Sequence, residues 1–174
     1  PEFTQIDVEM SFVDIDDIQE STEGLITAMW KDVLGVDVQT PFPRITYADA
    51  MGKYGSDKPD TRFELFLCDI TDELKDSGLK VFAEAAKRGG IIKTLPVPDS
   101  AELTRKELDD TVGFAQERGA KGLAWARVTD EGWQSPIAKF LTDEERAAVN
   151  EKIGAKPGWT LFFVADDAGV VAVR

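Results

Sequence analysis

The chain has 174 residues, of which 43% are hydrophobic, and it carries a formal net charge of −13. This composition is typical of a globular protein with one hydrophobic core, or one core and part of a second. The absence of histidine and the presence of one cysteine, Cys68, argue against zinc sites, a catalytic triad and an internal disulfide, and they fit a reducing compartment.

The net charge and the length of the apolar runs argue against binding to DNA and to a membrane. A strongly acidic chain is a poor nonspecific ligand for DNA, because phosphate neutralisation needs clustered Lys and Arg. No apolar run approaches the roughly 20 residues of a membrane helix, and no secretion signal is recognisable at the start. The chain opens on Pro1 without an initiator methionine, as expected for a piece of a longer protein. The sequence predicts a cytoplasmic protein that binds neither DNA nor a membrane.

Segment 3–12 alternates apolar and polar side chains, which is the period of a half-buried strand. Its apolar face holds Ile6, Val8, Met10 and Phe12. Its polar face holds Gln5, Asp7, Glu9 and Ser11. Two carboxylates on one face of a strand lie about 6 to 7 Å apart, which is close enough to hold an ammonium group or a cation with a neighbour. The same pattern also fits a solvent-facing amphipathic strand.

A long amphipathic helix is predicted next. Asp14 is a suitable N-cap, acidic residues fill the first turn, and Gly35 is placed to end the helix. Apolar residues recur at steps of three and four, so we expect the helix to pack on a larger body. Pro41 and Pro43 then predict that segment 36–45 is extended and irregular.

A short helix and a loop are predicted between residues 46 and 62. Thr46, with Asp49 three residues later, predicts a short helix that ends near Gly55. Segment 54–62 contains Gly, Ser-Asp and Lys-Pro-Asp, which are turn-forming combinations. By turn chemistry alone it is a surface loop.

The remainder of the chain mixes strands and helices. We predict strands at 63–70, 79–85, 90–97, 121–128 and 159–165. We predict helices at 72–77, 104–119 and 142–154, and a helical turn at 135–141; Thr104–Glu107 and Thr142–Glu145 form capping boxes. Residues 87–90 are expected to form a hairpin turn, and 170–174 remain unassigned. This order predicts an α+β fold in which one layer of helices packs on a sheet, that is, a two-layer α/β sandwich.

Several stretches resemble bacterial-type aspartyl-tRNA synthetases of class II. PEFTQIDVEMSF at 1–12 resembles the second half of motif 2, and TYADAMGKYGSDKPDTR at 46–62 resembles the segment that follows it. LTRK at 103–106, GAKGLA at 119–124 and SPIAKFL at 135–141 are similar to the GAD insertion domain of these enzymes. The resemblance implies that residues 1–62 are a strand–helix segment of the antiparallel catalytic core and that residues 63–174 are a GAD-type insertion domain, truncated at its C-terminal end.

The resemblance also implies roles. The full enzymes use ATP and Mg²⁺ to activate aspartate, transfer it to aspartate tRNA, and are expected to be homodimers. By position, Asp7 would hold the ammonium group of aspartate, with Glu9 and Gln5 orienting it. Ser56, Asp57 and Lys58 would belong to an active-site loop. Basic pairs are the candidates for contact with the tRNA acceptor arm: Lys87, Arg88, Arg105 and Lys106.

The same resemblance places the motif 2 arginine upstream of Pro1, and the magnesium ligands and motif 3 beyond Arg174. The chain alone is therefore expected to contain no catalytic residue and no metal ligand, to bind no cofactor and to catalyse nothing.

Other interpretations remain open at this stage. A noncatalytic tRNA- or protein-binding GAD module of a tRNA-dependent amidotransferase would share the second part of the chain, and an acidic interaction domain unrelated to tRNA is a third interpretation. The sequence leaves open what the insertion does and whether the full enzyme also charges asparagine tRNA. Trp125, Trp133 and Trp159 could stack on bases, but tryptophans in such positions more often belong to a core.

Overall fold

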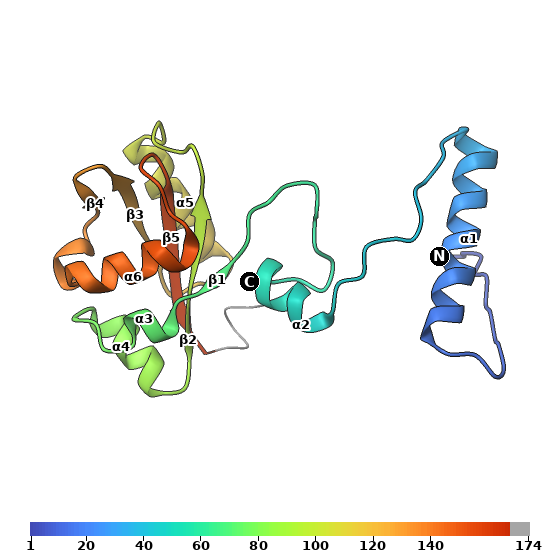
Figure 1. Ribbon diagram of the computed structural model, residues 1–174, viewed down its shortest axis with the longest axis horizontal. Coiled ribbons are helices and arrows are strands. Elements are labelled where there is room, and N and C mark those ends of the chain that lie inside the picture. Colours follow the sequence, from blue (N-terminus) through green and yellow to red (C-terminus); the bar gives the residue numbers. More distant parts are fainter. Residues whose placement is uncertain (168–174) are drawn as a thin grey trace. The chain divides into compact units, whose positions relative to one another are not determined.

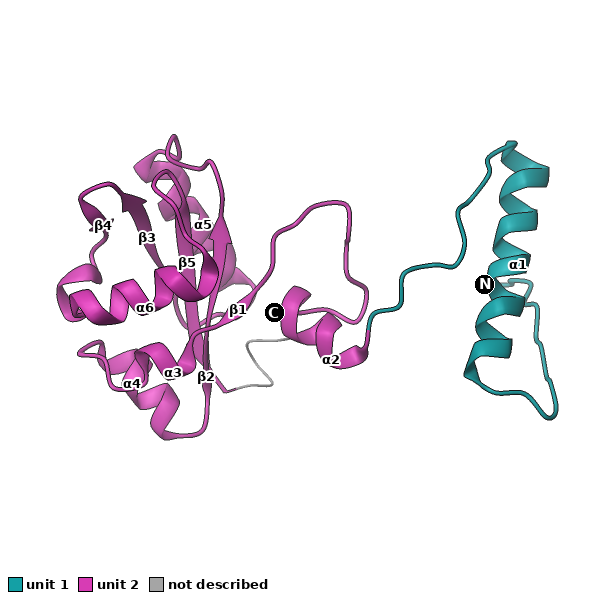
Figure 2. Cartoon of the chain, in the orientation of Figure 1, with its two compact units in different colours: residues 1–45 teal, residues 46–174 magenta. Residues whose placement is uncertain are grey.

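The computed structural model describes residues 1–167, and the chain divides into two compact units (Figure 2). The first unit is Pro1–Ile45 and the second is Thr46–Arg174. The unassigned segment 170–174 lies outside the described residues. The first unit is built around one helix, and the second is built around a sheet.

Most of the first unit is the long helix α1 (Ile15–Leu34). The carboxylate of Asp14 accepts hydrogen bonds from the backbone N–H groups of Asp16 and Asp17, and the carboxylate of Asp17 accepts one from the Asp14 N–H. Gly35 ends the helix with φ 68°, a left-handed conformation that glycine adopts without steric cost. The helix predicted between Asp14 and Gly35 is therefore confirmed at both ends.

Segment 36–45 is irregular, as predicted, and one buried carboxylate of α1 holds it. The Glu23 carboxylate accepts a hydrogen bond of 3.0 Å from the backbone N–H of Phe42 and lies 2.5 Å from Nη1 of Arg44. Only 10% of the Glu23 side chain is exposed. A buried carboxylate needs such partners, because an unpaired charge away from water is costly.

Segment 3–12, predicted as a strand, is not one. It forms no ladder with any described strand, and Phe12 has φ 60°, which lies outside the strand region. Apolar side chains that the prediction assigned to a buried face are exposed: Ile6, Val8, Met10 and Phe12. A strand needs a neighbouring strand for its backbone hydrogen bonds, and the first unit offers only a helix and irregular chain.

The second unit opens with a short helical segment, α2 (Tyr47–Asp49) continued by the π-helical turn η1 (Ala50–Tyr54). Thr46 Oγ1 accepts a hydrogen bond from the backbone N–H of Asp49, which confirms the predicted cap. The Lys93 ammonium group donates to the carbonyl of Gly52 at 2.7 Å. This contact fastens the helical segment to the sheet that follows.

The sheet of the second unit has five antiparallel strands in the order β1-β2-β5-β3-β4 (Figure 1). The strands are β1 (Cys68–Asp69), β2 (Ile91–Val97), β3 (Ala124–Thr129), β4 (Gly132–Gln134) and β5 (Thr160–Asp166). In the central pairs, Thr94 lies opposite Phe163, and Ala126 lies opposite Leu161. Because side chains alternate between faces along a strand, these residues share one face of the sheet.

Helices α3 (Thr71–Leu74), α4 (Lys80–Lys87) and α6 (Asp143–Ile153) cover that face, together with the 3₁₀ turn η2 (Ala138–Phe140) (Figure 1). The core between helices and sheet includes Leu74, Phe82, Ile92, Val128, Val149, Leu161 and Phe163. Helix α5 (Arg105–Glu117) lies against the opposite face, where it buries Leu108 and approaches Trp125. The predicted α+β class is confirmed, and α5 adds cover on the second face.

Two predicted strands are wrong in whole or in large part. Segment 79–85 belongs mostly to helix α4, whose buried residues Phe82 and Ala85 are three positions apart, a helical rather than a strand spacing. Of segment 63–70, only Cys68–Asp69 pairs with β2. Short strand β4, which follows β3 after a tight turn, was not predicted.

The predicted hairpin turn at 87–90 is instead a helix-to-strand turn. Gly89 has φ 77°, and a Cβ at Gly90 would lie 2.6 Å from the carbonyl oxygen of Asp166 and 2.9 Å from that of Ala85. Glycine is therefore required here by close backbone approach.

The predicted capping boxes are confirmed, and two of the tryptophans, Trp133 and Trp159, lie in or against the core. Both capping boxes, at Thr104 and Thr142, are present in full. Trp133 is 7% exposed in the core, and its Nε1–H donates to Asn150 Oδ1 at 3.0 Å. Trp159 packs against the same core, and Trp125 is half-buried with the Arg105 guanidinium 5.6 Å from the centre of its ring.

Candidate functional site

The polar row of segment 3–12 is open to solvent. Gln5, Asp7 and Glu9 are all exposed, and none takes part in a hydrogen bond or ion pair among residues 1–167. Without a strand, the alternation of side chains no longer places the two carboxylates on a common face. The assignment of these residues to an ammonium site therefore stays a prediction.

The loop predicted to belong to an active site is internally bonded. Ser56 Oγ accepts a hydrogen bond of 3.0 Å from the backbone N–H of Lys58, which is a small side-chain turn. Nearby, Arg62 clamps Asp60 with Nε and Nη2, at 2.8 Å to Oδ1 and 2.5 Å to Oδ2. These hydrogen bonds lower the pKa of Asp60. Asp57 and Lys58 are exposed, and their assignment to an active-site loop stays a prediction.

The two basic pairs predicted to contact tRNA are not brought together. Lys87 and Arg88 end α4, immediately before β2 begins. Arg105 and Lys106 begin α5, after β2 has ended. The pairs therefore flank opposite ends of the same strand and do not form one basic patch.

The second pair is also partly engaged. Arg105 Nε lies 3.2 Å from Asp109 Oδ1, and its guanidinium stands 5.6 Å from the centre of the Trp125 ring. Both contacts are at the surface, where an ion pair is screened and contributes little stability. Contact with a phosphate would have to compete with Asp109.

An ion pair that the sequence did not predict lies at the end of β5, between Lys121 and Asp166. Lys121 Nζ lies 2.8 Å from Asp166 Oδ1, and the Asp166 side chain is 4% exposed. The hydrogen bond from Lys121 lowers the pKa of Asp166, with smaller contributions from the Asp167 backbone N–H and from Arg88. Lys121 and Asp166 are 45 positions apart. No local pattern could have found this pair, because only the register of the sheet joins them.

Two open hollows lie beside this ion pair. One, of about 610 Å³, is lined by Arg88, Lys121, Phe82 and Phe163 among others. The other, of about 300 Å³, lies between α5 and the sheet and is mainly apolar, with Phe114, Phe162, Lys93 and Arg118 in its lining. Their walls combine apolar surface with groups of both charges, since Glu84 and Asp167 line the first hollow and Asp166 lines the second, so neither hollow selects a ligand by its charge.

Lys93 is the most buried cation of the sheet, with 7% exposure. Burial lowers its pKa, and the carboxylate of Asp69 and the nearby Cys68 oppose that shift. Burial also favours the neutral form of Cys68: it raises the pKa of the thiol, which keeps the thiol protonated and unreactive near neutral pH. Because the Lys93 ammonium group already binds Gly52, we interpret Lys93 as a structural tie.

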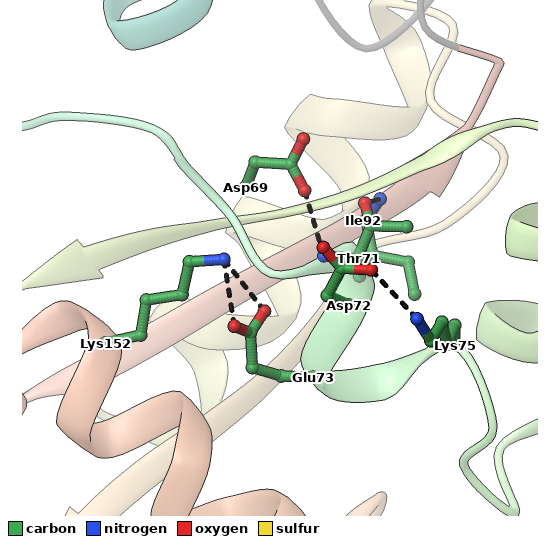
Figure 3. Close-up of polar contacts among 7 residues, drawn as sticks. All are labelled: Asp69, Thr71, Asp72, Glu73, Lys75, Ile92 and Lys152. Carbon is green, nitrogen blue, oxygen red and sulfur yellow. Dashed lines mark hydrogen bonds and ion pairs between the residues drawn. The ribbon is translucent and has the colours of Figure 1, made fainter.

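A polar cluster around α3 is likewise structural (Figure 3). Asp69 accepts a hydrogen bond from the Thr71 backbone N–H, and the Thr71 hydroxyl accepts one from the Ile92 N–H at 2.8 Å. Lys152 of α6 reaches Glu73 at 2.9 Å. These contacts join α3 to β2 and to α6, so we interpret the cluster as structural.

The donors of the described residues do not fit a magnesium site. No group of three or more Asp, Glu, Cys or His side chains in residues 1–167 is arranged to hold a metal ion. No reaction step is therefore assigned to a metal on this part of the chain. Within the same residues, no helix is both long enough and apolar enough to cross a membrane.

Nearly the whole chain is similar to a part of bacterial aspartate–tRNA ligases. The chain is 50% identical over 171 residues to the aspartate–tRNA(Asp/Asn) ligase of Oleidesulfovibrio alaskensis, covering 98% of this chain and 28% of that protein. It is 50% identical over 172 residues to the aspartate–tRNA ligase of Halalkalibacterium halodurans, covering 98% of this chain and 29% of that protein. The chain thus spans less than a third of the length of these curated relatives.

The family comparison concerns the second unit. The model of the GAD domain matches residues 82–174, which is more than half of the chain. The matched region begins within α4 and includes strands β2 to β5 of the sheet. The chain therefore belongs to the GAD domain family.

Proposed function

We propose that this chain is part of an aspartate–tRNA ligase that activates aspartate with ATP and transfers it to tRNA. The observation that carries the proposal is the extent of the similarity, which reaches 50% identity over 98% of the chain. A GAD module alone accounts for residues 82–174. The similarity to ligases also includes the residues before 82, which an amidotransferase module has no need to keep.

Within this proposal, the exposed carboxylates of the first unit bind the substrate. Asp7 accepts charge-assisted hydrogen bonds from the α-ammonium group of aspartate, and Glu9 and Gln5 orient it. Their exposure and lack of partners among the described residues support this role, because a binding carboxylate must be free to accept. Ser56, Asp57 and Lys58 form a loop of the active site.

ATP and Mg²⁺ act in the longer protein, and Mg²⁺ bound there would supply charge neutralisation at the phosphates. We propose that the metal ligands lie in the longer protein and that this chain contributes substrate contacts. The longer protein is proposed to be a cytoplasmic homodimer.

The test is aspartate-dependent exchange of pyrophosphate into ATP, followed by charging of tRNA. The full-length protein that contains this chain is expected to catalyse both reactions, and the 174-residue chain alone neither. Asp7→Asn in the full-length protein should lower kcat/KM for aspartate about 10- to 100-fold, the cost of removing a charged hydrogen-bond acceptor. Glu2→Gln, at another exposed carboxylate just before segment 3–12, should leave kcat/KM for aspartate unchanged. A full-length protein without aspartate-dependent exchange would disprove the proposal.

The relatives differ in their printed names, one naming tRNA(Asp/Asn) and the other tRNA alone. Charging of purified aspartate and asparagine tRNAs by the same enzyme measures which specificity applies to this protein. Equal charging of both tRNAs indicates the broader specificity.

The basic pairs are proposed to contact the tRNA acceptor arm separately, because they flank opposite ends of β2. Charge reversal of Lys87 and Arg88 should weaken tRNA binding by the full-length protein more than reversal of Arg105 and Lys106, since Arg105 already pairs with Asp109. Unchanged binding with all four reversed would exclude this contact.

A further inference from the structure

Helix α1 has one covered face, and segment 36–45 contacts that face. Only four of its 20 residues are buried or half-buried, and they recur at helical spacing on one side: Gln19, Glu23, Ile26 and Thr27. In segment 36–45 the two half-buried side chains are Val38 and Phe42. Because Glu23 contacts this segment directly, the covered face of α1 is where the segment is held.

Two ties of unequal strength hold segment 36–45 on the helix. At its start, Lys31 Nζ lies 2.7 Å from Asp37 Oδ1, but both side chains are more than half exposed, so this ion pair contributes little. At its end, the buried Glu23 carboxylate binds the Phe42 backbone N–H and the Arg44 guanidinium. Breaking a buried charged contact costs far more than breaking an exposed one. Glu23 is therefore the principal tie.

The chain is anchored again immediately after this segment. Thr46 caps α2 by accepting a hydrogen bond from the Asp49 N–H, and the boundary between the two units falls directly before Thr46. The Lys93 ammonium group then holds the carbonyl of Gly52. One residue, Ile45, separates the part of the chain that Glu23 holds from the part that the second unit holds.

The Glu23 tie thus sets the length of the free connection. With the tie closed, the chain spans at most about 7 Å from residue 44 to residue 46. With the tie open, the free stretch reaches back to Asp37, and an extended chain from there to Thr46 spans about 30 Å. The position of Glu23 in the sequence, near the middle of α1, gives no indication of this function.

We propose that Glu23 is a positioning residue for the ligase reaction, because it keeps the connection between segments 3–12 and 54–62 short. This role rests on the proposed function, in which residues of both segments serve one active site. Catalysis depends on holding reacting groups to within about 1 Å, so a long tether lowers the rate even when every substrate contact is intact. Glu23 acts through the chain and touches no substrate.

The first experiment uses the full-length protein and compares Glu23→Ala with Glu20→Ala, an exposed carboxylate on the same helix. Per active site, Glu23→Ala should lower kcat of aspartate-dependent pyrophosphate exchange about tenfold and change KM for aspartate less than about threefold. Hydrogen exchange of the peptide containing Phe42 should become faster. Glu20→Ala should change none of these quantities. Glu23→Gln should restore most of the activity, since its amide oxygen still accepts from the Phe42 N–H.

A second variant lengthens the connection without touching the tie. Insertion of Gly-Ser-Gly between Ile45 and Thr46 should lower kcat as much as Glu23→Ala does, while exchange at Phe42 stays slow. Adding Glu23→Ala to the insertion should lower kcat little further, because both changes remove the same constraint. Thermal unfolding and active-site titration verify that each variant is folded. Wild-type kcat in the insertion variant would overturn the proposal.

The outcomes separate this role from the ligase activity itself. An active wild type with unchanged kcat in Glu23→Ala removes the positioning role and leaves the ligase proposal intact. A wild type without aspartate-dependent exchange removes both. Rapid exchange of the Phe42 amide in the wild type, which is measured without any activity, would show that the tie does not form and would also overturn the positioning role.

Discussion

Helices α1 and α6 begin in the same way but are stabilised very differently. Each has a complete capping box, formed by Asp14 with Asp17 and by Thr142 with Glu145. Four large side chains of α1 nevertheless remain 40–44% exposed, namely Ile18, Leu25, Met29 and Trp30. Helix α6 places Val149 at 0% exposure in the core. The comparison teaches that local signals fix where a helix starts, whereas burial against a sheet provides most of its stability.

The largest effect should come from emptying the core of the second unit. Phe163→Ala removes a 1% exposed ring that contacts Phe82 and Trp133, so it should lower the free energy of unfolding by about 3 to 5 kcal/mol. Met29→Ala in α1, where the side chain is 43% exposed, should cost less than about 1 kcal/mol. Urea unfolding measures both, and equal losses would refute the contrast between the units.

Two glycines test the same contrast through the backbone. Gly90→Ala places a Cβ 2.6 Å from the Asp166 carbonyl oxygen and should destabilise the second unit by about 1 to 3 kcal/mol. Gly24→Ala in α1 meets no atom within 4 Å and should stabilise the helix by about 0.5 to 1 kcal/mol. Thermal unfolding should show opposite signs, and a neutral Gly90→Ala would mean that the turn relaxes easily.

Removing a helix cap should give a smaller effect. Thr142→Ala deletes the oxygen that accepts from the Glu145 N–H and should cost about 1 kcal/mol of global stability. Asp14→Ala should instead increase amide exchange only near the start of α1, because little tertiary packing depends on that helix. Hydrogen exchange distinguishes these outcomes, and global destabilisation by Asp14→Ala would show that α1 contributes to a shared cooperative unit.

The smallest effect concerns pH. The pKa of Asp166 is lowered below its ordinary value of 3.8, chiefly by the hydrogen bond from Lys121. A depressed carboxyl pKa stabilises the fold above the unfolded-state pKa, and that stability is lost as pH falls through the folded-state pKa. Lys121→Met should therefore lower Tm at pH 6 and have less effect near pH 3. An equal loss of Tm at both pH values would show that Lys121 contributes by packing and not by charge.

Sequence patterns worked where the determining contacts are local. The ends of α1, α5 and α6 were predictable because a capping residue and its partner lie three positions apart. Strands β2, β3 and β5 were predictable because their apolar runs are bounded by glycine or proline signals. Segment 79–85 was misassigned because a run of seven residues with several apolar positions fits a strand as well as a helix.

The candidate sites also differ in whether they depend on local sequence or on long-range contacts. Gln5, Asp7 and Glu9 were chosen from alternation and resemblance, and their proposed role still depends on a partner surface that the described residues do not supply. The Lys121–Asp166 pair was not predictable, because its two members are 45 positions apart in the chain.

The sequence by itself determined the helix caps, the acidic character, the central strands and the similarity to the GAD domain, since each depends on residue type and short spacing. Only the tertiary structure decided that segment 3–12 is not a strand, that residues 80–87 form a helix, and that Lys121 pairs with the buried Asp166. The physical reason is that strand pairing and burial depend on partners far away in the chain, and no local pattern specifies those partners.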